Sequence, residues 1–187
     1  MEPVSSVATT LSTPSAAFRI IPSGNFRAQD GRPKNVNAWK MDAEVAKRLI
    51  DTANSRSDDY LIDFEHASIG ANGPVPAAGW FKKLEWRSGD GLYVTGAKWT
   101  NRAKQMINAG EYRYVSPVFT YDTNGMVGSL ISVGLTNSPA LSGLTDLQNM
   151  AINKIQNQSN SLQNLDLGSE ESNKYFRRAF PNLFGSR

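Results

Sequence analysis

The chain has 187 residues, of which 40% are hydrophobic and 20% charged, and this balance predicts one globular domain of ordinary size with room for tails. The formal net charge of +3 is small and the basic residues are not clustered, so no specific nucleic-acid partner is expected. Cysteine is absent, which excludes disulfides, thiolate zinc sites and cysteine nucleophiles.

The sequence shows neither a secretory signal nor a membrane span. Its beginning, MEPVSSVATTLSTPS, lacks the apolar run of a signal peptide. No window approaches the roughly 18 apolar residues that a spanning helix needs. We therefore expect a soluble protein that stays inside the cell and has no membrane partner.

The first half of the chain predicts an arm, two strands and a helix. Residues 1–16 are rich in Ser, Thr, Ala and Pro, which predicts a disordered arm. Residues 17–26 predict a strand that ends at a Pro-Ser-Gly turn. A helix is expected from Asp42, which can cap it, to Ser55, because apolar residues recur at helical spacing. These residues are Val45, Ala46, Leu49, Ile50 and Ala53. Residues 60–66 alternate between apolar and polar and predict a short strand.

The centre of the chain predicts a loop, a hairpin and a second helix. Residues 70–79 are a loop rich in Gly and Pro, and residues 80–99 contain two aromatic-rich runs around a turn at 88–91. Thr100 is expected to cap a short helix that Gly110 closes.

Two further strands and a tail follow. Residues 112–121 are rich in β-prone side chains, although Pro117 lacks a backbone donor and is expected to break or bulge the strand pairing. Residues 126–135 predict the last strand. From 145 to 187 the chain is rich in Asn, Gln and Ser, which predicts a tail that needs a partner to order it.

Residues 17–144 therefore form the predicted folded domain. Its predicted class is α+β: a bent, mostly antiparallel β-barrel with a few flanking helices. The reason is that short strands separated by glycine-rich turns dominate the pattern.

His66 is the only histidine and the side chain best suited to general-base work near neutral pH. Without cysteine, the nucleophile of a covalent mechanism falls to Ser, Thr or Lys. One histidine permits a Ser–His pair and excludes a His-rich metal site. Asp58, Asp59 and Asp63 could form a carboxylate site for Mg²⁺ or Ca²⁺ but lack EF-hand spacing. No metal and no cofactor are expected.

His66 and its candidate partner, Ser116, also have a purely structural interpretation. A histidine at a strand end commonly hydrogen-bonds its neighbours, and Ser116 is equally an ordinary edge-strand serine. Two features favour function. His66 precedes a loop rich in Gly and Pro, where functional groups are commonly displayed, and Pro117 disturbs the strand so that the Ser116 hydroxyl can point into a cleft.

Several stretches together resemble the phage Mu-type I protein family, the protease and scaffold proteins of Mu-like phages and prophages. The most specific are LIDFEHASI, PVPAAGWFKKLEW, GEYRYVSPVF and LTNSPAL, in this order, and the resemblance covers about residues 18–144. It implies a maturation protease distantly related to prohead proteases and to the herpesvirus assemblin type. In that group a bent β-barrel carries a histidine on one strand and the nucleophilic serine on a later one. The matching residues here are His66 and Ser116.

The third catalytic position departs from the family pattern. In the broader group a histidine or an acidic residue on the strand after the nucleophile orients the imidazole, but residues 126–135 contain neither. By its distance from LTNSPAL, Ser132 takes this position, where a hydroxyl stabilises imidazolium less than a carboxylate does. Strand alternation is expected to place Asp63 and Glu65 on the face opposite His66.

The resemblance also implies an oxyanion site, substrates and a location. Backbone N–H groups near Ser116, together with Arg113, are the oxyanion candidates, although Pro117 cannot donate. The implied substrates and partners are phage scaffolding and major capsid proteins and the chain itself, inside the assembling procapsid in the host bacterial cytoplasm. Family members often continue into a scaffolding region, so residues 145–187 have three interpretations: the start of that region, a processed end, or an end without biological meaning.

Three functions remain open from the sequence. The first is a serine endopeptidase of phage head maturation that also cleaves itself. The second is a catalytically impaired relative that acts as a scaffold or capsid-interaction protein, which the missing third residue and the tail favour. The third is a small-molecule hydrolase, although the G-x-S-x-G elbow of common esterases is absent.

Overall fold

The computed structural model describes residues 14–147 of the chain. The predicted N-terminal arm, 1–16, and the predicted tail, 145–187, lie almost entirely outside the described residues. The described part consists mostly of strands, with two helices, α1 (Ala43–Ser55) and α2 (Asn101–Asn108), which confirms the predicted α+β class. Neither helix is long and apolar enough to cross a membrane.

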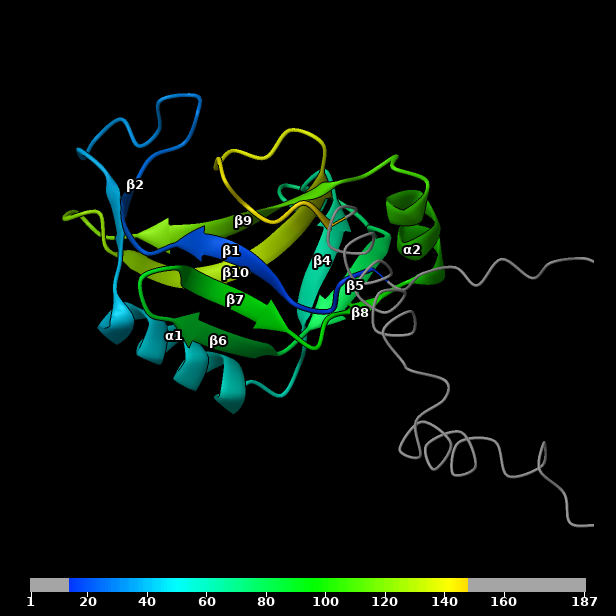
Figure 1. Cartoon of the computed structure of the whole chain (residues 1–187), viewed down its shortest axis with the longest axis horizontal. Coiled ribbons are helices and arrows are strands. Elements are labelled where there is room, and N and C mark those ends of the chain that lie inside the picture. The colour runs from blue at the N-terminus through cyan, green and yellow to red at the C-terminus, as the bar shows by residue number, and fades with distance from the viewer. Residues whose placement is uncertain (1–13, 148–187) are drawn as a thin grey trace, which may run out of the picture. The chain divides into compact units, whose positions relative to one another are not determined.

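The strands form three sheets (Figure 1). The largest has the order β8-β5-β4-β10-β9, the second the order β1-β7-β6, and the smallest joins β2 and β3. Their bounds are β1 (Phe18–Pro22), β2 (Gly24–Phe26), β3 (Trp39–Met41), β4 (Tyr60–Phe64), β5 (Ala77–Phe81), β6 (Lys83–Arg87), β7 (Gly91–Thr95), β8 (Lys98–Trp99), β9 (Tyr114–Tyr121) and β10 (Val127–Thr136). Among these strands all pairings are antiparallel except that of β4 with β10.

The structure corrects the predicted barrel, because within residues 14–147 no sheet closes on itself. The two edges of the five-stranded sheet are β9 and β8, and β8 is only two residues long. Short strands and glycine-rich turns indicate where strands begin and end. Closure depends on pairing between distant strands, which periodicity does not reveal. The consequence for the site is that β9 is paired on one side only.

Both helices confirm their predicted caps. The Asp42 carboxylate accepts from the backbone N–H of Val45 at 2.9 Å at the start of α1. The apolar side of α1 packs beside β6 (Figure 1). At the start of α2 the Thr100 hydroxyl accepts from Ala103 N–H at 3.2 Å, and Gly110 follows the helix with a φ of 76°. The positive φ explains why a glycine ends this helix.

The core lies between the two larger sheets and α1. It combines buried side chains of β1, such as Phe18 and Ile21, with those of the five-stranded sheet, such as Ile62 and Val133. A second, smaller cluster joins Ala28 and Trp39, from the N-terminal part of the chain, to Leu141 and Leu144 near the end of the described residues. Leu147 is also buried in the main core, so the described residues after 144 pack against the domain.

Candidate active site

Ser116 lies on the edge strand β9 and is only 3% exposed. Its register partner on β10 is Gly134, and Gly134 is partnered in turn by Asp63 on β4. Residues directly opposite each other in neighbouring strands point to the same face of a sheet. Ser116, Gly134 and Asp63 therefore form a row across three strands, which we call the central row.

The predicted interruption at Pro117 is not observed. β9 runs without a break from Tyr114 to Tyr121, and Pro117 pairs with Val133. Irregular pairing occurs further along, on both sides of Leu130 in β10. An edge strand tolerates proline where its nitrogen faces away from the neighbouring strand, so the missing donor need not disrupt the pairing.

His66 follows a strand that ends earlier than predicted. The strand predicted over 60–66 stops at Phe64. Glu65 and His66 then adopt φ values of 53° and 58°, in the left-handed region that residues other than glycine rarely occupy. The Ala67 N–H donates to the Phe64 carbonyl at 3.0 Å and closes a turn. Strand alternation therefore stops before it reaches His66.

The His66 ring packs against the backbone of Gly134. A β-carbon added at Gly134 would lie 2.7 Å from both Nδ1 and Cε1 of the ring and 3.0 Å from Cγ. The φ of Gly134 is not positive, so the space taken by the imidazole explains the glycine. His66 thus lies over the middle residue of the central row, next to Ser116. The expectation that alternation puts Asp63 on the face opposite His66 is wrong.

His66 and Ser116 line one cleft with a volume of about 670 Å³. Clefts of this size bind ligands in many proteins. Most of its other side chains are apolar or aromatic, and a smaller group is cationic or polar. The apolar group includes Trp39, Ile69, Val118, Phe119, Tyr121 and Leu141, and the polar group includes Arg32, Lys34 and Asn35. The Trp39 and Phe119 rings pack edge to face, with centroids 5.1 Å apart.

Asp63 is fully buried, and only one of its carboxylate oxygens is hydrogen-bonded. Oδ2 accepts from the backbone N–H of Ser68 at 2.9 Å and also from the Ser68 hydroxyl. Within the described residues, Oδ1 of Asp63 and Nδ1 of His66 are both buried and lack a hydrogen-bond partner. Sequence reasoning did not identify Asp63 as part of this site.

Glu65, the other carboxylate near His66, is engaged elsewhere. It accepts a hydrogen bond from the Thr136 hydroxyl at 2.7 Å. Burial raises the pKa of Tyr112, and the negative charge of Glu65 and a hydrogen bond to it raise that pKa further. Across residues 14–147, no group of three or more His, Asp or Glu side chains could hold a metal ion.

Ser132 lies two residues before Gly134 on β10 and therefore points to the same face as the central row. It pairs with Val118, two residues from the Ser116–Gly134 pair, and its buried Oγ has no hydrogen-bond partner in the described chain. Its role as the orienting group therefore stays a prediction.

Arg113, the predicted oxyanion residue, pairs with Asp146. Hydrogen bonding to Asp146 and its negative charge raise the pKa of Arg113. The backbone carbonyl of Arg113 accepts from Leu147 N–H at 2.9 Å. Arg113 does not line the cleft that holds His66 and Ser116.

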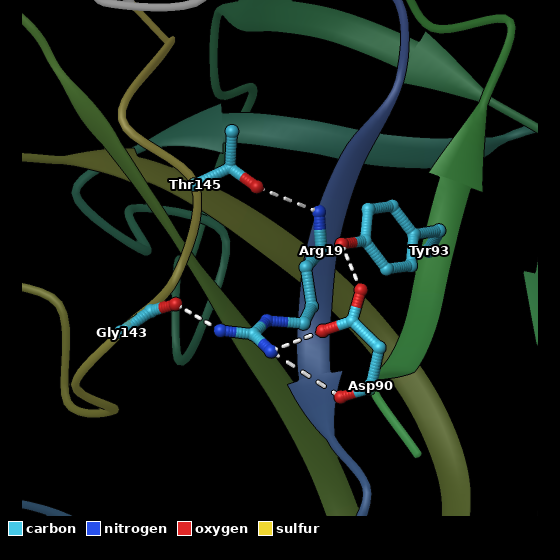
Figure 2. A network of polar contacts seen from close by, with 5 residues as sticks. All are labelled: Arg19, Asp90, Tyr93, Gly143 and Thr145. Carbon is cyan, nitrogen blue, oxygen red and sulfur yellow. Dashed lines mark hydrogen bonds and ion pairs between the residues drawn. The ribbon is translucent and has the colours of Figure 1, made fainter. Parts of the chain in front are cut away.

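A polar network ties residues 143–145, which follow the cleft residue Leu141, to β1 and to the turn before β7 (Figure 2). The Arg19 guanidinium donates to the Asp90 carboxylate and to the Gly143 carbonyl, and the backbone N–H of Arg19 donates to the Thr145 hydroxyl at 3.0 Å. The Tyr93 hydroxyl donates to Asp90 at 2.6 Å. This donation and the Arg19 charge hold the pKa of Asp90 below its usual value.

The domain thus presents a strand serine and a histidine in one cleft of an α+β fold. The chain belongs to the Mu-like prophage I protein family: the family's N-terminal domain matches residues 18–148. This confirms the family that the sequence motifs indicated.

Two curated relatives carry informative names. The chain is 38% identical over 144 residues to Protease I of Escherichia phage Mu, an alignment covering 71% of this chain and 40% of the relative. It is 37% identical over 153 residues to the Mu-like prophage FluMu I protein of Haemophilus influenzae, covering 76% and 42% respectively. The chain therefore spans about two fifths of the length of these relatives. No solved structure matches it.

Proposed function

We propose that this domain is a serine endopeptidase of phage head maturation, with Ser116 as the nucleophile and His66 as the general base. The observation that carries the proposal is the His66 ring lying over Gly134, the cross-strand neighbour of Ser116. Membership of the family supports it, and so does the name Protease I of the phage Mu relative.

In the proposed reaction the Ser116 hydroxyl attacks the carbonyl carbon of the scissile peptide bond. His66 takes the hydroxyl proton and then gives it to the amine that leaves, which produces an acyl-enzyme. Water, deprotonated by the same imidazole, releases the acid product. The oxyanion needs donors other than the residue after the nucleophile, because Pro117 has no N–H.

The proposed substrates are extended peptide segments of phage scaffolding and capsid proteins and of the chain itself. Support comes from the cleft and from β9, whose edge is unpaired by any described strand and can accept a substrate strand. The apolar and aromatic lining favours apolar side chains near the cleaved bond. The proposed setting is the assembling head inside the host bacterium.

The alternative is a relative with impaired catalysis that binds scaffold or capsid protein. One observation favours it: Nδ1 of His66 makes no hydrogen bond in the described chain, so nothing fixes the tautomer of the imidazole.

Incubation of the full chain with its cognate scaffold and capsid proteins separates the two. We expect mass spectrometry to show products that the wild-type chain generates and Ser116→Ala does not. Ser129→Ala, the same substitution at an exposed position on β10, is the matched control and should cleave normally. Products from Ser116→Ala would refute the proposed nucleophile. Binding without cleavage by the wild-type chain would support the alternative.

A further inference from the structure

We propose that Asp63 is the positioning residue for His66, accepting the Nδ1 proton of the imidazole on its Oδ1 atom. The inference rests on the proposed Ser116–His66 mechanism and adds its third member. It starts from two atoms near the cleft, Asp63 Oδ1 and His66 Nδ1, which are buried and have no partner among the described residues. One is an acceptor and the other can carry a proton, and buried polar groups rarely stay unpaired.

The central row gives the spacing that such a pair requires. Neighbouring strands lie about 4.8 Å apart, so Asp63 and Ser116, on either side of β10, have Cα atoms about 10 Å apart. The His66 ring occupies the space over Gly134, midway between them. An imidazole in that place can present one nitrogen to each neighbour. Because Gly134 has no side chain, nothing on β10 separates the ring from the carboxylate.

The Asp63 carboxylate is already held in place. Both hydrogen bonds from Ser68 go to Oδ2, which leaves the lone pairs of Oδ1 free. Ser68 belongs to the same turn that carries His66, so the carboxylate anchors the segment whose imidazole it would orient. A rigid carboxylate that keeps one free oxygen is suited to fix a histidine tautomer.

The two competing groups fit less well. Glu65 bonds to Thr136. Ser132 is two residues before Gly134 on β10, about 6.6 Å from it, whereas Asp63 is directly opposite Gly134. A hydroxyl is also neutral and stabilises the imidazolium formed during the reaction less than a carboxylate does.

The proposed bond acts by holding the proton on Nδ1. Nε2 then keeps its lone pair for the Ser116 hydroxyl, and Asp63 stabilises the imidazolium without taking its proton. Asp63 and His66 are not hydrogen-bonded in the structure. Such bonds are often long in the free enzyme and tighten when substrate binds, so a long starting geometry is compatible with the role, and even a long contact with the carboxylate favours the proton on Nδ1.

The single histidine makes a direct test simple, because ¹⁵N NMR of the labelled full chain reports one imidazole. At about pH 8.5, where an imidazole is ordinarily neutral, we expect the wild-type ring to be mainly the Nδ1–H tautomer. A wild-type ring that is mainly the Nε2–H tautomer would overturn the proposal without any variant.

Asp63→Asn is the matched perturbation, since the amide keeps an oxygen for Ser68 but can offer NH₂ instead of an acceptor to Nδ1. We expect the ring to shift to the Nε2–H tautomer and kcat to fall by a factor on the order of 10⁴ with little change in KM. Asp51→Asn, the same charge change on the exposed side of α1, should alter neither. An unchanged tautomer in folded Asp63→Asn would refute the positioning role of Asp63. The same shift of tautomer caused by Ser132→Ala or Glu65→Gln would also refute it.

The NMR experiment tests the positioning role of Asp63, and the cleavage assay tests the proposed protease function, so the two claims can be refuted separately. If the wild-type chain cleaves nothing but the tautomer responds to Asp63→Asn, the proposed protease function is wrong and the Asp63 contact stands. If cleavage is normal and the tautomer ignores Asp63, the protease function stands and the positioning role is wrong.

Discussion

Gly134 is the position where a one-carbon change tests the geometry of the site most sharply. In Gly134→Ala the new methyl group would lie 2.7 Å from two atoms of the His66 ring. Ordinary contacts between such atoms are about 3.5–4.0 Å, so the ring has to retreat by about 1 Å. A misplacement of about 1 Å of a reacting group costs about 10²-fold in rate. We therefore expect kcat for cleavage to fall about a hundredfold.

The fold should survive this change. Alanine in a strand interior is favoured over glycine by about 0.5–1 kcal/mol, which offsets part of the crowding. The assay is the initial rate of product formation from the scaffold protein, measured beside thermal unfolding of the same preparation. We expect a near-normal unfolding temperature with a large loss of rate.

Gly128→Ala is the matched control on the same strand. Its added β-carbon would lie 2.7 Å from the Thr120 hydroxyl oxygen, which accepts from the Ser129 N–H at 2.9 Å. Thr120 is exposed and remote from His66 in sequence and register, so any adjustment there leaves the His66 ring in place. It should cleave at the wild-type rate. In a His66→Ala background the ring is gone, so adding Gly134→Ala should not reduce the residual rate further. Full activity in a folded Gly134→Ala chain, or a further loss in the double variant, would refute the packing argument.

Three other predictions test separate parts of the structure. Ser132→Ala should slow cleavage by at most roughly tenfold, far less than His66→Ala, because a neutral hydroxyl that is not the orienting group contributes no more than about 1 kcal/mol; equal losses of rate in the two variants would contradict this and favour Ser132 as the orienting group. Asp90→Asn should lower the unfolding temperature at neutral pH. The folded-state pKa of Asp90 lies below its unfolded value, so the stabilisation by this carboxylate is complete above about pH 4 and is lost on further acidification. The difference in unfolding temperature between Asp90→Asn and wild type should therefore disappear at low pH, and a difference that persists there contradicts this. Asp42→Ala should cost about 1 kcal/mol in urea unfolding through loss of the α1 cap, with cleavage unchanged; an unchanged urea midpoint would show that the cap contributes nothing.

The parts of the fold with local causes were predictable from the sequence. Both helices have a capping side chain at one end and apolar spacing between their ends, and both were found where Asp42 and Thr100 indicated. The choice of His66 as base followed from composition, because no other histidine exists. Barrel closure failed as a prediction because it depends on which distant strands pair.

The site geometry depends on features that a single sequence hides. The strand containing Asp63 ends two residues before His66, and the left-handed backbone at Glu65 and His66 has no glycine to mark it. Extending the alternation through that turn put Asp63 on the wrong face. The need for glycine at position 134 is likewise a long-range effect, visible only once the His66 ring is seen against β10.

The most direct test of the central claim is covalent labelling of the full chain with a fluorophosphonate, followed by peptide mass spectrometry. These reagents react with serine hydroxyls that a neighbouring base activates. We predict one adduct, on Ser116, that disappears in His66→Ala and persists in Gly128→Ala. No adduct in the folded wild-type chain, or an adduct on another serine, would contradict the assignment of Ser116 and His66 as nucleophile and base.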